Sequence, residues 1–365
     1  MDGLVLSGGG AYGAYELGAI KALFEKGVLN QAGVVTGTSV GAFNAAVLCM
    51  HGGGAEALRR LEDVWLHVIA ESKSGTPNGV LRLRGNPLSS SVRGFVQDSM
   101  YLARAGFDRG TAFFSARGGI FSRSLELVDI SAFISVEPLK RTIASEISCA
   151  QIRESPVQLR VVATDWERGG YRVFTNADLT SAAILASTAI PSLFPPVHFD
   201  NTTWVDGGVT MNTPLKPAVQ AGANVIHVVS LDASLHRVAA SELDNTVEAM
   251  MRTLSIAIAT AIREDMSTAA WINHGLAALE KARSGEELTS EEVRDFVRVA
   301  AQLEQRARGE LQLQPVTIHH YHPIDSLGGP LGLLNFGRDA VMELIARGRR
   351  DALAHDCKES GCVLA

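Results

Sequence analysis

A serine within a G-x-S-x-G pentapeptide is the first residue whose setting could do chemistry. Ser39 lies between Gly37 and Gly41, after an apolar run typical of a strand and before a segment typical of a helix. A sharp strand-to-helix turn crowds the backbone, so glycine is needed on both sides of the serine. Such a turn places the hydroxyl at a helix N-terminus, where N–H groups favour developing negative charge. We therefore predict that Ser39 is a nucleophile and not part of an ordinary structural turn.

A second glycine-rich turn, at residues 7–13, allows two interpretations. Gly8, Gly10 and Gly13 satisfy the G-x-G-x-x-G fingerprint of dinucleotide-binding proteins. That fingerprint also needs an acidic residue near the end of the next strand, and none stands there. Alternatively, the consecutive glycines Gly8, Gly9 and Gly10 let several N–H groups converge as an oxyanion hole. We favour the oxyanion hole.

A serine nucleophile needs a base to accept its proton. Asp206 follows a predicted strand and precedes Gly207 and Gly208, which would let another backbone approach closely. The ordinary interpretation of such an aspartate is a turn residue. Histidine is the more usual base, although His227 falls inside an apolar strand where a core role is expected. The histidines weighed as alternatives are His198, His227, His319, His320 and His322.

Three ordered motifs together resemble those of the patatin-like phospholipase family. They are the glycines at positions 8–10, the pentapeptide around Ser39 and the tripeptide from Asp206 to Gly208. Further positions agree in order and spacing, namely the run 186–196 and then Asn212, Pro214, Gly222 and Ala223. The resemblance covers roughly residues 4–231, apart from the stretch 75–123.

The resemblance implies hydrolysis of lipid acyl esters by a Ser–Asp dyad that uses no histidine. Ser39 would be the nucleophile, Asp206 the base, and residues 8–10 the oxyanion hole. It also implies an α/β fold with a central, mostly parallel sheet. One position departs from the family pattern: many members have Arg or Lys directly before the glycine at position 13, where this chain has Tyr12. This chain therefore has no cationic side chain at position 12 that could bind a phosphate.

Two strand–turn–helix units must position these residues. The first pairs a strand at 4–6 with a helix at 15–26, and the second pairs a strand at 34–36 with a helix at 42–50. Such units predict a three-layer α/β fold, with a mostly parallel sheet between helices. The whole chain, 1–365, is predicted to be one domain, with a mostly helical C-terminal part over 242–355 that breaks near Ser284. Later strands are expected at 159–164, 171–174, 203–205, 225–230 and 316–320.

The stretch 75–123 differs from the rest and is predicted to be a cap-like insertion. It carries seven arginines against two acidic residues, interleaved with phenylalanine and tyrosine. Arginine suits phosphate oxygens, and aromatic rings suit the boundary between water and acyl chains. We predict a lipid interface here that includes Arg82, Arg84 and Arg93. The alternative is a surface excursion whose aromatic rings pack on the core.

Composition excludes several classes of protein. Hydrophobic residues make up 46% of the chain, which excludes a disordered or fibrous protein. A net charge of −6 argues against nucleic-acid binding. The four cysteines look too few and too scattered for a disulfide scaffold or a zinc site, so we expect a reducing compartment and no metal or cofactor. No signal segment opens the sequence, and no apolar run approaches the roughly 20 residues of a membrane span, so any membrane contact should be peripheral.

The expected function is that of a serine lipid acyl hydrolase of the phospholipase A or lysophospholipase type, acting in the cytoplasm or at a membrane surface. One alternative is a non-catalytic lipid- or nucleotide-binding module, and another is a small-ester or thioester hydrolase with the same dyad. The last four residues, Cys362 to Ala365, also fit a C-a-a-X prenylation box. Four-residue patterns arise readily by chance, so prenylation of Cys362 is only a secondary option.

Overall fold

A central eight-stranded sheet organises the molecule. The computed structural model describes residues 1–70, 78–83, 134–231, 246–306, 314–328 and 332–365. Five strands run parallel in the order β10 (Thr317–Tyr321), β9 (Val225–Val229), β1 (Asp2–Leu6), β2 (Val34–Thr38) and β5 (Gln158–Asp165). The antiparallel part comprises β6 (Gly170–Thr175), β7 (Val197–Phe199) and β8 (Thr202–Asp206). Each later strand predicted from the sequence is present to within two residues.

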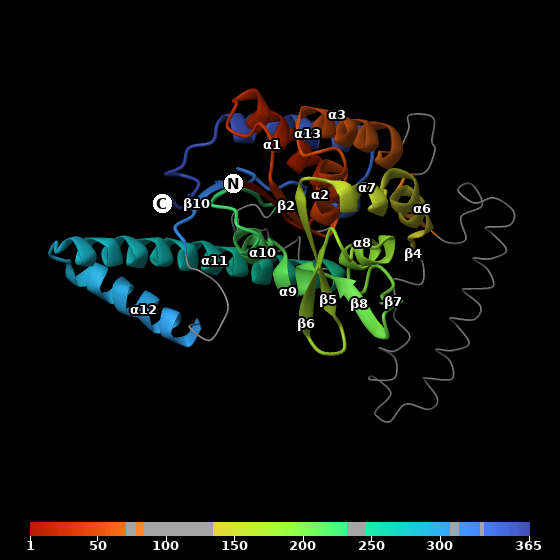
Figure 1. The fold of residues 1–365 in the computed structure, drawn as a ribbon. Helices are drawn as coiled ribbons and strands as arrows, with labels where there is room; N and C mark the ends of the chain where they lie inside the picture. The colour runs from red at the N-terminus through yellow and green to blue at the C-terminus, as the bar shows by residue number, and fades with distance from the viewer. Residues whose placement is uncertain (71–77, 84–133, 232–245, 307–313, 329–331) are drawn as a thin grey trace, which may run out of the picture.

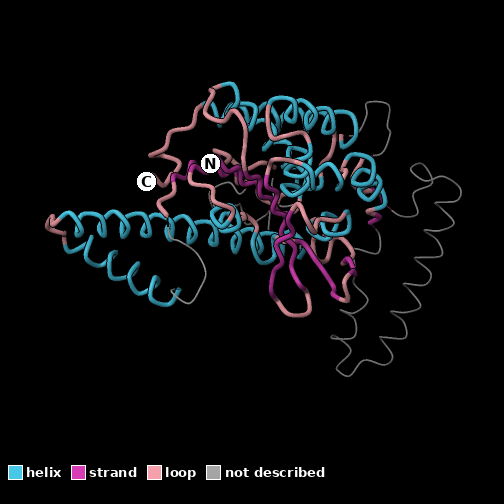
Figure 2. Tube along the Cα trace, in the orientation of Figure 1, coloured by secondary structure: helices cyan, strands magenta, loops and turns pink. Residues whose placement is uncertain are grey.

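Helices cover both faces of this sheet, so the predicted three-layer α/β fold is confirmed (Figures 1 and 2). One face carries α1 (Gly13–Glu25), α2 (Val40–Met50), α3 (Ala55–Val64) and α13 (Arg338–Leu353). The other carries α9 (Gly208–Met211), α10 (Leu215–Gln220) and α11 (Thr246–Ser284). The remaining helices are α6 (Glu137–Glu146), α7 (Cys149–Glu154), α8 (Ser181–Ser187) and α12 (Ser290–Arg306), with short turns at Gly10–Tyr12, Trp65–Ile69 and Gly332–Leu334.

The C-terminal part is largely helical, as predicted. The long helix α11 ends at Ser284, and Gly285 follows in a left-handed conformation with φ +80°, so the break falls where the sequence placed it. Strand β10 then returns the chain to the sheet edge before α13. Among the described residues, no helix is both long and apolar enough to cross a membrane.

The arginine-rich stretch 75–123 lies mostly outside the described residues. Within it, β3 (Arg82–Leu83) pairs antiparallel with β4 (Ile134–Ser135), which places Arg82 opposite Ser135. Arg84 and Arg93 fall outside the described residues. The lipid-facing role of this stretch stays a prediction.

Candidate active site

The turn around Ser39 is as tight as the sequence suggested. Ser39 has φ 55° and lies between the end of β2 and the first residue of α2. A β-carbon on Gly37 would collide with the Gly41 carbonyl, and one on Gly41 would collide with the carbonyl of Leu6. A left-handed conformation is costly for a residue with a side chain, and such strain is typical of functional positions. The two glycines thus make room for a strained turn that presents the Ser39 hydroxyl.

A second serine, Ser187, stabilises this turn through a hydrogen bond to its backbone. Ser187, the last residue of α8, is fully buried, and its Oγ accepts a hydrogen bond from the Ser39 N–H at 2.9 Å. The same hydroxyl donates to the carbonyl of Val162 on β5 at 2.6 Å. Ser187 therefore fixes the Ser39 backbone to the sheet. The sequence analysis included it in a family-like run but gave it no role, because a lone serine in an alanine-rich helix carries no local signal.

Asp206 meets Ser39 because two strands end head to head on β5. Strand β6 occupies one edge of β5, so β2 and β8 both pair with the other edge, one after the other. Thr38 stands opposite Val162, and Asp206 stands opposite the next residue, Ala163. A β-carbon on Gly207 would collide with the Val162 carbonyl and lie 3.0 Å from the Thr38 side chain. The glycine after Asp206 is what lets the two strand ends come this close.

The carboxylate of Asp206 is buried and only partly hydrogen-bonded. Its Oδ1 accepts a hydrogen bond from the Gly208 N–H at 2.7 Å, whereas the buried Oδ2 has no hydrogen-bond partner among the described residues. Burial raises the pKa of Asp206 to about 7, and the neighbouring Ser39 hydroxyl and Gly208 N–H only partly oppose this shift. A carboxyl with a pKa near neutrality is suited to accept and return a proton.

The glycine-rich turn after β1 lies directly against Ser39. A β-carbon on Gly8 would come within 3.0 Å of the Ser39 Cβ. Gly8 also exchanges hydrogen bonds with Asn212: its N–H donates to the Asn212 carbonyl at 3.1 Å, and its own carbonyl accepts from Asn212 Nδ2 at 3.2 Å. The N–H groups of Gly9 and Gly10 have no partner among the described residues. Of the three donors predicted for an oxyanion hole, the Gly8 N–H is therefore already used, and those of Gly9 and Gly10 are the ones left to serve that role.

A buried polar network joins the two turns. The Asn44 amide on α2 donates to Glu16 Oε2 on α1 at 2.8 Å and to the Gly13 carbonyl at 3.1 Å, and its Oδ1 accepts from Trp65 Nε1 at 2.9 Å. Burial raises the pKa of Glu16 well above its ordinary value, which favours a neutral carboxylic acid there. This network holds α1 and α2, the helices that follow the two turns, in a fixed relation. The sequence analysis missed it because a glutamate on a predicted helix is usually exposed.

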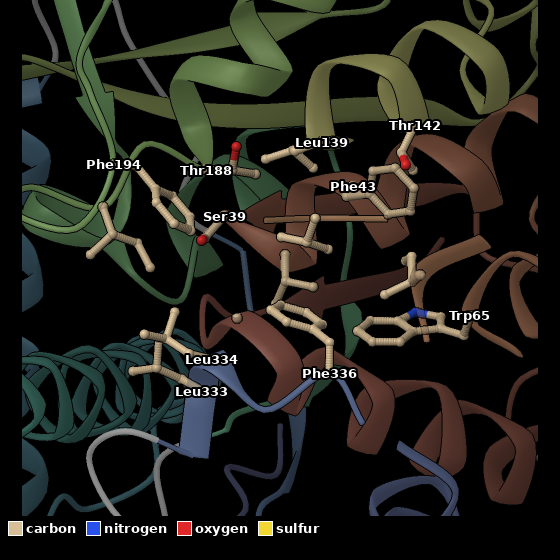
Figure 3. A pocket seen from close by; sticks show the side chains of 15 residues that line it. Ser39, Phe43, Trp65, Leu139, Thr142, Thr188, Phe194, Leu333, Leu334 and Phe336 are labelled. Carbon is tan, nitrogen blue, oxygen red and sulfur yellow. The ribbon is translucent and has the colours of Figure 1, made fainter. Parts of the chain in front are cut away.

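An apolar pocket opens at Ser39. It could not be predicted from the sequence. Its empty volume is about 510 Å³, counting the part open to solvent. Figure 3 shows Ser39 at one end beside Phe194, with Trp65 and Thr142 towards the other. Apart from Gly10 and Thr188, the remaining walls are aliphatic and aromatic side chains, namely Val40, Phe43, Ile69, Val80, Leu139, Ile190, Leu333, Leu334 and Phe336. Such a lining suits a hydrocarbon chain attached at the Ser39 end.

Among the described residues, no histidine contacts Asp206 or Ser39. His198 is exposed on β7 and bonds to Thr203 Oγ1 at 3.1 Å. His227 is buried in β9, where its ring stacks on His319 with centroids 5.3 Å apart. His320 pairs with Ser230 Oγ at 2.8 Å. His322 lies beside the carbonyl of Pro323.

Two of the four cysteines are not scattered in the fold, which corrects that part of the sequence-based argument against a metal site. Cys357 and Cys362 lie together with His319 and His355, far along the chain but adjacent in the fold. Cys49 and Cys149 lie elsewhere, and all four thiols are free. The sequence analysis missed this cluster because His319, on β10, is far along the sequence from the other three residues.

Comparison with known proteins finds distant relatives of the chain. A 28% identity over 233 residues relates the chain to NTE family proteins of Mycobacterium tuberculosis and Mycobacterium bovis, covering 63% of this chain and 49% of theirs. A 21% identity over 265 residues relates it to triacylglycerol lipase 5 of Saccharomyces cerevisiae, covering 67% of this chain and 31% of the yeast protein. The chain thus spans a half or less of the length of these curated relatives.

Among solved structures, the crystal structure of VipD from Legionella pneumophila aligns over 94% of this chain and 66% of its own, with 15% identity and a TM-score of 0.37. A likeness this weak says nothing about residue roles. The family model for patatin-like phospholipases matches residues 4–219, which include the glycine-rich turn, the Ser39 turn and Asp206. The chain belongs to the patatin-like phospholipase family, whose members are lipid hydrolases.

Proposed function

We propose that this chain is a serine lipid acyl hydrolase of the phospholipase A or lysophospholipase type, with Ser39 as nucleophile and Asp206 as base. The observation that carries the proposal is the meeting of three features at one point: a strained serine, a buried carboxylate and an apolar pocket. A turn that only bound a ligand would need neither the strained serine nor the desolvated carboxylate.

The proposed reaction has two halves. Asp206 accepts the proton of the Ser39 hydroxyl as Oγ forms a bond to the acyl carbonyl carbon. The carbonyl oxygen becomes an oxyanion, which the N–H groups of Gly9 and Gly10 stabilise. The bond to the leaving alcohol then breaks, and Asp206 returns the proton to that alcohol. In the second half, water gives a proton to Asp206 as its oxygen attacks the acyl-enzyme carbonyl. The bond to Ser39 Oγ then breaks, Asp206 returns the proton to Oγ, and the fatty acid is released.

Active-site labelling tests the proposal directly. A fluorophosphonate probe is expected to bond covalently to Ser39 in the wild-type chain, and Ser39→Ala should abolish the labelling. Ser290→Ala, which removes an exposed hydroxyl at the start of α12, should leave the labelling of Ser39 unchanged. If the folded wild-type chain takes up no probe and releases no fatty acid from phospholipid or lysophospholipid vesicles, the chain is a binding module instead.

The pH dependence should report Asp206. Because its pKa is raised to about 7, the carboxyl is protonated below neutral pH and cannot accept the Ser39 proton. We expect kcat/KM for a soluble ester to fall about tenfold per pH unit below pH 7 and to level off above it. A steady-state pH profile from 5 to 9 measures this. An acid limb near pH 4 would mean that Asp206 is a solvated carboxylate or not the base.

The pocket should set the acyl-chain preference. Thr142 lies far from Ser39 within the pocket (Figure 3), and its hydroxyl donates to the Gly79 carbonyl at 2.7 Å. Thr142→Phe would fill that end and displace about four methylenes, at about 0.8 kcal/mol each. We expect kcat/KM to fall on the order of 10²-fold for long-chain esters and little for acetyl esters.

A matched control distinguishes the effect of filling the pocket from the effect of losing the hydrogen bond between Thr142 and Gly79. Thr142→Val also removes the hydroxyl but keeps the volume, so it should retain the wild-type preference for chain length. Equal losses for long and short esters in Thr142→Phe would mean that the acyl chain binds elsewhere. The adjoining hollow, which shares Leu139, Thr188 and Phe194 with this pocket, would then be the next place to test.

A further inference from the structure

Four metal-ligating side chains gather at the sheet edge formed by β10. His319 lies on β10, His355 lies two residues after the end of α13, and Cys357 and Cys362 lie in the segment that follows. Their donor atoms all lie within 4.8 Å of one another. No part of the hydrolytic mechanism uses any of these residues.

The spacing of the donors fits a tetrahedral ion. Cys357 Sγ is 3.4 Å from His319 Nδ1 and 3.6 Å from His355 Nε2, and Cys362 Sγ is 3.4 Å from His355 Nε2. Zinc bonds of about 2.3 Å to sulfur and about 2.05 Å to nitrogen, at tetrahedral angles, place those atoms about 3.6 Å apart. Three of the six donor pairs therefore already stand at nearly the separation that a bound ion requires, and the other pairs lie within 4.8 Å.

The surrounding structure holds the donors in place. The N–H of His320 donates to Cys362 Sγ at 3.2 Å, a bond that suits a thiolate. Val363 pairs with Ile318 through two backbone hydrogen bonds of 2.7 and 2.9 Å, which fastens the tail to β10. Between the cysteines, Gly361 turns the chain with φ +66°, and the Cys362 N–H donates to the Cys357 carbonyl at 3.0 Å.

Aromatic rings fix the two imidazoles. The buried His227 ring stacks on His319, and the Tyr321 ring lies 4.2 Å from that of His355. Packing of this kind restricts the rotation of ligand side chains, as metal sites require. The arrangement thus has a donor set, a geometry and a supporting shell.

We propose that His319, His355, Cys357 and Cys362 bind one Zn²⁺ ion in a structural Cys₂His₂ site. Two thiolates and two neutral imidazoles match the preference of Zn²⁺ for sulfur and nitrogen donors in closed four-coordinate sites. Binding would release the two thiol protons and leave the site without net charge. With all four positions taken by protein, the ion would have no open position for catalysis.

The site would tie the end of the chain to the catalytic layer. It joins β10 to the segment after α13, and α13 packs against α1, where β-carbons on Gly18 and Gly348 would collide with the facing backbone. Helix α1 in turn follows the glycine-rich turn at residues 7–13, which lies against Ser39. The ion would also protect the edge strand β10, because it fastens the tail along it. Its expected contribution is to stability.

Metal analysis tests the proposal independently of hydrolysis. The full chain, purified under reducing conditions without chelator or metal-binding tag, is expected to carry about one zinc per chain. Cys357→Ser and His355→Gln should each lose the zinc, whereas Cys149→Ser, a half-buried thiol outside the cluster, should keep it. Removing zinc from the wild type should lower the melting temperature by about 5 °C, and Zn²⁺ but not Mg²⁺ should restore it.

Cobalt substitution provides a second readout should a variant fail to fold. Co²⁺ added to the reduced, metal-free wild-type chain should give the intense visible bands of a tetrahedral site with thiolate ligands. The proposal is overturned if the reduced wild type carries no zinc and binds neither ion at micromolar concentration. It is equally overturned if the native chain contains a Cys357–Cys362 disulfide or a prenylated Cys362, since either would consume a ligand.

Discussion

Replacing Ser39 by alanine or Asp206 by asparagine is expected to remove nearly all lipid hydrolysis, on the order of 10⁴-fold or more in kcat. The serine supplies the attacking oxygen and the carboxylate accepts its proton, so neither works without the other. Residues that act as a unit lose about as much singly as together, and the double variant should therefore be no slower than Ser39→Ala. Fatty-acid release from vesicles and turnover of a soluble ester both measure this.

The stability of Asp206→Asn distinguishes a catalytic role from a structural one. The pKa of Asp206 is raised from 3.8 to about 7, so the folded protein holds this proton more tightly than the unfolded chain does. Ionisation therefore lowers the free energy of unfolding as pH rises from about 4 to about 7. Asparagine removes that cost, and at pH 8 the inactive variant should melt at or above the wild-type temperature.

Histidine variants provide the matched control. His198→Ala removes an exposed ring that touches neither Ser39 nor Asp206, and it should leave kcat within about twofold of wild type. His227→Ala removes a buried ring and should lower stability more than it lowers kcat. A folded His198→Ala or His227→Ala that is as inactive as Ser39→Ala would replace the dyad with a histidine-containing triad.

The parts of this site that local sequence encodes are those that backbone geometry demands. Gly37, Gly41 and Gly207 could be singled out because each stands where a β-carbon would collide with a carbonyl oxygen. The strands were predictable because they are short apolar runs, bounded by turns, that become buried in the sheet. These features could be predicted from the local sequence alone.

The parts that sequence could not give depend on contacts between distant segments. The Gly8 N–H donates to the carbonyl of Asn212, which lies 204 positions away in the sequence, and the pocket walls come from both ends of the chain. The same holds for His319, which reaches Cys357 only because β10 and the tail lie side by side. Pairing on one edge of β5, which brings Asp206 to Ser39, is likewise a property of the sheet and not of either motif.

Gly10→Ala is expected to lower kcat on the order of 10²- to 10³-fold with little change in KM. The N–H of Gly10 is one of two open donors beside Ser39, and an oxyanion exists only in the transition state and the intermediate. Gly10 has φ +58°, and an added β-carbon would collide with the Leu333 carbonyl, so the turn must shift and misdirect its N–H. A β-carbon on Gly9 would meet the Leu231 side chain, 2.7 Å from Cδ1 and 3.1 Å from Cβ, and no backbone carbonyl, so Gly9→Ala should cost less.

Gly27→Ala separates backbone strain from lost catalysis. Gly27 has nearly the same left-handed conformation, φ +67°, and within the described part of the chain a β-carbon added to Gly27 would have no atom within 4 Å apart from its own neighbours. The Gly27→Ala variant should lose about 1 kcal/mol of stability from the conformation alone, while its kcat stays at the wild-type value.

If Gly10→Ala instead raises KM and keeps kcat, the turn binds the substrate in its ground state. Tight binding of NAD or another nucleotide by the wild type, lost in Gly10→Ala, would restore the dinucleotide interpretation, because two amide donors alone do not account for tight and specific binding of a whole nucleotide.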